Sequence, residues 1–396
     1  MELIYARDII GIALGLIILM VFIFKGVSIY VTGLVAVVVL AIVSGVGYSE
    51  AVSAWLGGWT SYLSGYLVVF LMGGFFGKMM ELTGAAISVA RFLIKYLGNA
   101  GALLAVGVTA AIMTYGGVSI FISCTAVIPL VLEIFKKANI PHRFMPAILL
   151  YGAYSIGHQA PGNPTANNLI PYQYLNQLDP SVTMMSGLVI GWAICIGEFI
   201  LSWWLLRRMI KKAQARGESF SMMPGEFAAD EDVSLPNPIV SLIPLVSVVV
   251  FCNLRFNGTD LFQDKSIAIF CSCILCLLVG FKYLNWKKDF LKGIADSAVG
   301  TISMITGMCS IIGFASVVAK TDSFSGIVSA IMGLPGTPLI SAFVFVSLLC
   351  AITGSGSGGI GIVAPIVAEE FMAKGVSMRA LCRVMCMRSV GLDSLP

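Results

Sequence analysis

Two stretches of the chain combine glycines with hydroxyl side chains inside segments that are otherwise strongly apolar, TYGGVS in the first half and TGSGSGG in the second. Glycine lets the backbone turn and approach a ligand closely. The helix that follows each stretch presents free N–H groups and a positive dipole end, which suit a carboxylate. The binding candidates are therefore Thr114, Gly116, Gly117, Ser119, Thr353, Ser355, Ser357 and Gly358. Helix packing through small residues is the alternative, but the matching polar pattern in both halves favours a binding site.

A third polar segment, GHQAPGNPTANNLIP, runs from Gly157 to Pro171. Its prolines cannot continue a helix, and its amides would be costly against lipid. The segment is either an exterior loop or part of the binding site, and its candidates are His158, Pro161, Gly162, Asn163, Pro164, Thr165 and Asn167. Its counterpart in the second half is GLDSLP at Gly391–Pro396, which contains Asp393 and follows Arg388. Arg388 could neutralise a substrate carboxylate or pair with Asp393.

Three titratable side chains are candidates for coupling transport to protons. Glu198 stands in the middle of the apolar run WAICIGEFILSWW, where a charge costs about 2.5–3.5 kcal/mol on insertion scales. Asp393 is favoured by its place beside the second break, and His158 titrates near neutral pH. Glu198 and His158 each have a purely structural alternative, as a paired or hydrogen-bonded side chain.

Only 11% of the 396 residues are charged and 58% are apolar, whereas soluble domains carry about 25% charged residues. This composition predicts an integral membrane protein. The net charge of +4 fits positive cytoplasmic loops and does not indicate nucleic-acid binding. The ten cysteines lie mostly in apolar runs and are interpreted as buried apolar residues. Their spacing is not that of a zinc site, so neither a metal nor a cofactor is predicted.

The elements that must position these residues are apolar helices. Spans are predicted at Ile9–Phe24, Val27–Val46, Tyr62–Leu82, Ala102–Phe135 with an interruption at Tyr115–Gly117, Met145–Ile156, Ser186–Leu206, Pro238–Phe256, Ile267–Leu284, Ala298–Ala319 and Leu339–Ile352. Amphipathic segments are predicted at Ala85–Leu97 and Phe324–Gly333, and a helix to about Lys374 follows the second break. The charged stretch from Arg207 onward is predicted to be a cytoplasmic linker.

The two halves repeat, because four positions in Pro129–Arg143 match four in Pro365–Arg379 at a constant spacing. With the linker in the cytoplasm, Pro238–Phe256 runs outward and Lys287–Lys292 returns to the inside, and an inverted first half also keeps its basic residues inside. The predicted fold is therefore an all-α polytopic membrane protein with two inverted-topology repeats, broken helices and re-entrant segments. The predicted domains are a first repeat at 1–206, a linker at 207–236 and a second repeat at 237–396. The alternative is chance similarity between apolar helices.

The motifs TYGGVSIF, PGNP followed by NNLIP, ITGSGSGG and GLDSLP resemble the gluconate permease (GntP) family of the ion transporter superfamily, over nearly the whole chain. The resemblance implies a bacterial inner-membrane symporter that uses the proton gradient to take up a small organic acid. It also implies that the matching glycines, prolines, hydroxyl residues and Asp393 form the binding region. Members of the family continue beyond GLDSLP, so a second repeat that is incomplete at its C-terminal end is expected.

The function predicted from these features is proton-coupled symport of an organic anion such as gluconate or another hydroxy acid. A sodium-coupled carboxylate transporter of the same superfamily and a non-transporting membrane subunit are the alternatives. An enzyme is not predicted, because the sequence contains neither HExxH nor another nucleophile or metal constellation. The expected partners are the substrate anion, protons and the lipid bilayer, and a homodimer is compatible with the sequence.

Overall fold

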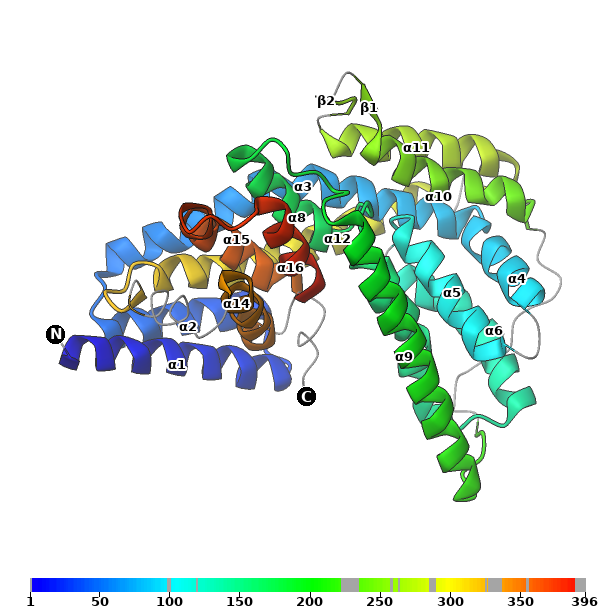
Figure 1. Ribbon diagram of the computed structural model, residues 1–396, viewed down its shortest axis with the longest axis horizontal. Coiled ribbons are helices and arrows are strands. Elements are labelled where there is room, and N and C mark those ends of the chain that lie inside the picture. The colour runs from blue at the N-terminus through cyan, green and yellow to red at the C-terminus, as the bar shows by residue number, and fades with distance from the viewer. Residues whose placement is uncertain are drawn as a thin grey trace. The chain divides into compact units, whose positions relative to one another are not determined.

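The computed structural model describes residues 2–97, 101–118, 120–221, 235–256, 259–262, 264–284, 290–324, 326, 337–353 and 356–388. These residues are almost entirely helical (Figure 1). The helices of the first half are α1 (Glu2–Phe24), α2 (Ile29–Ser44), α3 (Tyr48–Leu82), α4 (Ala85–Leu97), α5 (Ala102–Tyr115), α6 (Ile120–Ala138), η2 (His142–Phe144), α7 (Met145–Gly152), η3 (Ala153–Gly157), α8 (Ala166–Leu178) and α9 (Leu188–Ala215). Those of the second half are α10 (Pro238–Asn253), α11 (Lys265–Gly280), η4 (Phe281–Tyr283), α12 (Leu291–Val318), α14 (Pro338–Thr353), α15 (Gly356–Ala373) and α16 (Met378–Arg388), with a short hairpin of β1 (Arg255–Phe256) and β2 (Thr259–Asp260).

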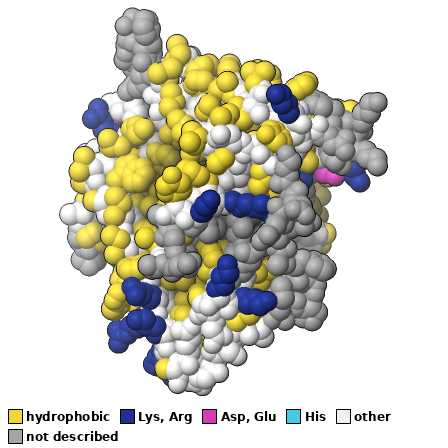
Figure 2. Space-filling view, turned by 90° about the vertical axis from the view of Figure 1, so that its right-hand side faces the viewer, with side chains coloured by type: hydrophobic (Ala, Val, Ile, Leu, Met, Phe, Trp, Pro, Cys, Tyr) yellow, Lys and Arg dark blue, Asp and Glu magenta, His cyan; other side chains and the backbone are white. Residues whose placement is uncertain are grey.

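Five helices in the described part of the chain are long and apolar enough to cross a bilayer. Large hydrophobic side chains stay exposed on them, such as Val189 at 79% and Ile190 at 69% on α9. Figure 2 shows a face on which hydrophobic side chains cover the upper part and lysines and arginines gather in the middle and lower parts. Exposed apolar surface of this extent is stable against lipid rather than water. The chain is accordingly a multi-pass membrane protein.

The chain forms two compact units, and each unit takes segments from both halves of the sequence. Unit 1 contains Met1–Phe70, Ala166–Gly187 and Gly300–Pro396. In it α1 and α2 run side by side and share a core with α12 (Figure 1). A second core joins α3 and α8 to α12, α14, α15 and α16.

Unit 2 contains Leu71–Thr165 and Leu188–Val299. Its helices α5 and α7 approach so closely that a methyl group on Gly152 would overlap the backbone of Gly107. Small residues allow this kind of contact in membrane helices, where close packing replaces the hydrophobic effect as the attraction. The Tyr151 hydroxyl strengthens the contact by donating to the Leu103 carbonyl over 2.7 Å. Helix α9 packs along the same pair through a ring contact between Phe199 and Tyr151.

Several predicted boundaries are wrong. Helix α3 begins at Tyr48 rather than Tyr62, because Tyr48–Ser61 is also compatible with a helix despite its lower hydropathy. The irregular segment ends at Thr165, and Pro171 lies inside α8. Asn163 precedes this early restart with an Asx turn, in which its side-chain oxygen accepts the Thr165 N–H over 3.0 Å. Helix α9 continues through the basic residues to Ala215, since arginine, lysine, leucine and alanine all favour helix.

Other predictions are confirmed or stay open. The helix interruption at Tyr115–Gly117 is present, and the all-α fold is confirmed. Most of the amphipathic segment at Phe324–Gly333 lies outside the described residues. The division into 1–206, 207–236 and 237–396 stays a prediction, because it concerns sequence repeats whereas the two units reflect packing.

Candidate functional site

The predicted binding residues are distributed over both compact units. Unit 2 holds those of the first break and the run from His158 to Thr165, while unit 1 holds Asn167, Ser357 and Arg388. Of Thr353 and Gly358 the structure describes the helical backbone, and Ser119, Ser355 and Asp393 lie outside the described residues. The convergence of the two breaks stays a prediction, since they belong to different units.

The first break is a tight turn between α5 and α6 in which the backbone amides of residues 116–118 all have partners. Gly116, Gly117 and Val118 donate to carbonyls of the last turn of α5 over 3.0–3.1 Å. Gly117 has φ +88°, a conformation that glycine adopts without strain. The chain therefore reverses inside an apolar segment without leaving amide groups of these residues unpaired, as the bilayer requires.

The polar run after α7 is also held in part by hydrogen bonds between its own residues. A single π-helical turn, Ala153–Gly157, precedes it, and Gly162 adopts φ +90°. The buried Asn163 donates to the Ala160 carbonyl over 3.0 Å and accepts from the Thr165 hydroxyl over 2.5 Å. The amides that the sequence marked as costly against lipid thus stabilise an irregular backbone within protein.

These two irregular segments contact each other inside unit 2. The Tyr115 hydroxyl at the end of α5 donates to the Pro161 carbonyl over 2.9 Å. A methyl group on Gly157 would overlap the Thr114 hydroxyl, so the two turns touch there without an intervening side chain. A methyl group on Gly117 would lie 3.4 Å from the Pro164 ring. The structure therefore brings together four of the residues that the sequence singled out, from two separate motifs: Thr114, Gly117, Pro161 and Pro164. The Gly162 carbonyl accepts a hydrogen bond from Asn253 on α10 over 2.6 Å.

Glu198 lies directly beside this region. Its carboxylate accepts a hydrogen bond from the Gln159 side chain over 3.0 Å, and the same amide nitrogen donates to the Tyr154 carbonyl over 2.9 Å. The Tyr154 ring also packs on His158, with 5.5 Å between centroids. Two of the three proton-coupling candidates are thus attached to one short stretch, since His158 and Gln159 are consecutive. The Gln159 amide is a neutral partner for this carboxyl group. Protonation of the carboxyl group therefore leaves no positively charged partner without a counter-charge.

In unit 1 the candidates belong to a different set of contacts. The Ser357 hydroxyl lies 3.6 Å from the Met308 sulfur. Arg388 donates to the Ser347 hydroxyl over 3.0 Å, and its guanidinium stacks 4.0 Å from the centroid of Phe343. These two contacts hold the Arg388 side chain against α14.

The sequence analysis missed Arg383, which is only 4% exposed in α16. Its guanidinium donates to the Asn168 side chain over 3.0 Å and to the carbonyls of Met184 and Ser186 over 3.1 and 3.0 Å. It thereby attaches α16 to α8 and to the loop that follows α8. The sequence LCRVMC could have indicated this residue, because it places an arginine among apolar residues and an intramembrane charge usually has a dedicated partner. Tyr115 and Asn253 were also not predicted as site residues. Tyr115 stands within the TYGGVS motif, which is the signal that could have found it, whereas nothing in the sequence pattern marks Asn253.

Apolar helices interrupted by polar, hydrogen-bonded turns are the architecture of a secondary transporter, in which irregular backbone lines the substrate path. The chain belongs to the GntP permease family: the sequence profile of the GntP family permeases matches residues 7–395. The predicted family membership is therefore confirmed, and the protein is a membrane transporter rather than an enzyme.

Relatives and a solved structure agree with this assignment. The chain is 30% identical over 372 residues to the uncharacterized transporter YxjC of Bacillus subtilis, covering 84% of this chain and 77% of that protein. It is 23% identical over 364 residues to the Gnt-II system L-idonate transporter of Escherichia coli, covering 85% and 79%. The crystal structure of the Alcanivorax borkumensis YdaH transporter, described as having an unusual topology, superposes with a TM-score of 0.58 at 16% identity, covering 85% of this chain and 76% of that one. This last similarity concerns the fold alone.

Proposed function

We propose that the protein is a proton-coupled symporter that takes up a small hydroxy acid anion through the bacterial inner membrane. The observation that carries this proposal is the contact between the first break and the Gly157–Thr165 run, with Glu198 hydrogen-bonded to that run through Gln159. A titratable group and a polar, irregular backbone thus share one region of unit 2. Coupling needs both, because protonation of the titratable group must change the affinity of the site that binds the anion.

The chemistry of the segments supports an anion with hydroxyl groups. The predicted binding residues supply amides, hydroxyls and the N-terminal end of α6 rather than a cluster of fixed charges, and they can pair with a polyhydroxy chain as well as with a carboxylate. The L-idonate transporter among the relatives carries a substrate of this class by its name. Gluconate and L-idonate are accordingly the first substrates to test.

In the proposed cycle Glu198 takes up a proton from the outer side when the substrate anion binds and releases it inside. The side chain of Gln159 reports the change, since a protonated carboxyl can donate a hydrogen bond and a carboxylate can only accept one. One negative charge entering with one or more protons removes most of the electrostatic cost of moving the anion through the membrane.

Proteoliposomes containing the purified protein test this proposal. We expect labelled gluconate or L-idonate to accumulate faster with an inward proton gradient, and a protonophore to abolish the difference. The sodium-coupled alternative predicts instead that replacing sodium by choline stops uptake while the proton gradient has no effect. Uptake of neither acid under any gradient would count against transport of this substrate class.

A further inference from the structure

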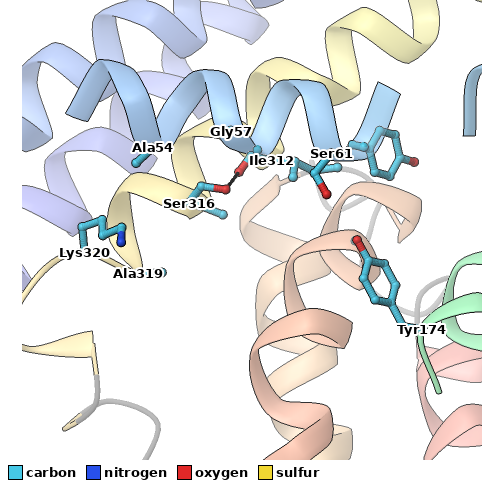
Figure 3. A pocket seen from close by; sticks show the side chains of 12 residues that line it. Ala54, Gly57, Ser61, Tyr174, Ile312, Ser316, Ala319 and Lys320 are labelled. Atoms are coloured by element: carbon cyan, nitrogen blue, oxygen red, sulfur yellow. Dashed lines mark hydrogen bonds between the residues drawn. The ribbon is translucent and has the colours of Figure 1, made fainter. Parts of the chain in front are cut away.

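A cavity of about 350 Å³ lies within unit 1, and its lining contains none of the residues that the sequence singled out. Residues of α3, α8, α12 and α15, and the two residues that follow α12, line this partly open cavity. Its lining combines small residues with hydroxyl groups and one lysine: Gly57, Ser61, Tyr174, Ser316 and Lys320 (Figure 3). The volume falls in the range of small-molecule sites, which bring a few polar groups together in a mostly apolar wall.

Two consecutive glycines on α3 explain why this space exists. A methyl group on Gly58 would meet the Gly313 backbone at 3.0 Å, so Gly58 allows α3 and α12 to pack tightly. The Trp55 indole N–H strengthens the same contact by donating to the Ser310 carbonyl over 3.3 Å. A methyl group on Gly57 would meet nothing within 4 Å, so Gly57 faces open space. Gly58 therefore allows the close helix contact, and its neighbour Gly57 leaves the cavity open.

The polar groups of the cavity separate into hydroxyls and a cation. The Tyr174 hydroxyl points toward Ser61, and Lys320 lies at the opposite end of the labelled residues (Figure 3). Lys320 has no ion-pair partner among the residues that the structure describes, and the exposed Asp322 does not line the cavity. A positive charge at one end and hydroxyls at the other match the carboxylate and hydroxyl ends of a hydroxy acid.

The predicted topology places this cavity on the outer side. If the linker is cytoplasmic, α10 runs outward, α11 returns and α12 runs outward again, so Lys320 after α12 faces the outside. The positive-inside rule does not account for a lysine there. An exposed cation at the outer end of a cavity raises the local concentration of anions and speeds their capture.

We propose that this cavity is an outer binding site at which a hydroxy acid anion is captured before it reaches the interrupted helices. The Lys320 ammonium binds its carboxylate, and Ser61 and Tyr174 bind its hydroxyl groups. This inference rests on the proposed function, because it names a second site for the same substrate class.

Uptake kinetics of labelled gluconate in proteoliposomes test the proposal with paired variants. We expect Lys320→Met to raise KM about three- to tenfold and to leave the maximal rate within about twofold, with a smaller difference at high salt because the attraction is electrostatic. Gly57→Leu should raise KM similarly by filling the cavity. Gly65→Leu is the matched control, since a methyl group on this glycine of α3 also meets nothing within 4 Å and does not line the cavity. Lys25→Met controls for the loss of an exposed lysine elsewhere in unit 1.

An unchanged KM in both Lys320→Met and Gly57→Leu overturns the proposal, as does an equal change in Gly65→Leu or Lys25→Met. If the wild-type protein takes up no gluconate, the proposed transport function is rejected, but the cavity can still be tested as a binding site. Equilibrium binding of gluconate to the detergent-purified protein is then the measurement. Weaker binding in Gly57→Leu but not in Gly65→Leu supports the site. Binding that is absent, or equal in both variants, rejects it and leaves a lipid headgroup as the occupant to be tested.

Discussion

Replacing Gly157 by alanine tests the contact on which the candidate site depends. The new methyl group would overlap the Thr114 hydroxyl and lie 2.6 Å from Thr114 Cβ, about 1 Å inside a normal carbon–carbon contact. Overpacking of this kind costs about 1–3 kcal/mol. At about 2–4 °C per kcal/mol the midpoint of thermal unfolding in detergent should fall by roughly 2–12 °C. Gluconate uptake should fall with it, because the polar run must move away from α5.

A double-mutant cycle separates this explanation from a general intolerance of Gly157. Thr114→Gly removes both offending atoms, after which the nearest neighbour of the new methyl group is the Tyr115 nitrogen at 3.4 Å. Gly157→Ala should then be nearly neutral when measured in the Thr114→Gly background. Gly197→Ala on α9 is the control, because its methyl group meets nothing within 4 Å. The predicted clash is excluded if Gly157→Ala unfolds at the wild-type midpoint, or if Thr114→Gly relieves none of its effect.

Substitutions at three further positions probe separate contacts. Glu198→Gln keeps the size of the side chain and its oxygen acceptor but cannot titrate, so uptake in proteoliposomes should lose its acceleration by an inward proton gradient; a preserved acceleration would exclude Glu198 as the coupling group. Arg383→Met removes three hydrogen bonds from a charged donor, so the free energy of unfolding should fall by at least about 3 kcal/mol. Arg383→Lys should have an intermediate effect. An unchanged midpoint of thermal unfolding in Arg383→Met would show that these hydrogen bonds do not stabilise the fold. Tyr115→Phe loses the bond to Pro161 but keeps its ring packing on Trp192, so a loss of about 0.5–1.5 kcal/mol is expected, and a larger one would mean that the hydroxyl has other partners.

The features that the sequence predicted are those with a local cause. The interruption between α5 and α6 follows from consecutive glycines within an apolar run, and it is present. The membrane-spanning character follows from composition and run length. The restart of the helix at Ala166 also follows a local feature, the Asx turn of Asn163, but the nearby prolines led to the prediction that the whole run to Pro171 is irregular.

The features that the sequence did not predict depend on which segments pack together. Tyr115 and Pro161 lie 46 residues apart, and Arg383 and Asn168 lie 215 apart. Hydropathy and periodicity are properties of one helix and contain no information about its neighbour. The resemblance between the halves was equally uninformative here, because the compact units combine segments from both halves.

The position of α8 connects these observations. The chain leaves unit 2 after Thr165, and the inserted segment Ala166–Gly187 packs with second-half helices in unit 1 before the chain returns at Leu188. Arg383 fixes this segment through Asn168, one residue after the predicted binding residue Asn167. Arg383 thus holds the segment that directly follows the polar run, whereas Tyr115 contacts the run itself within unit 2. If the polar run binds substrate, both Arg383→Lys and Tyr115→Phe should alter the KM for gluconate in uptake assays, and an unchanged KM in both variants would contradict this role of the run.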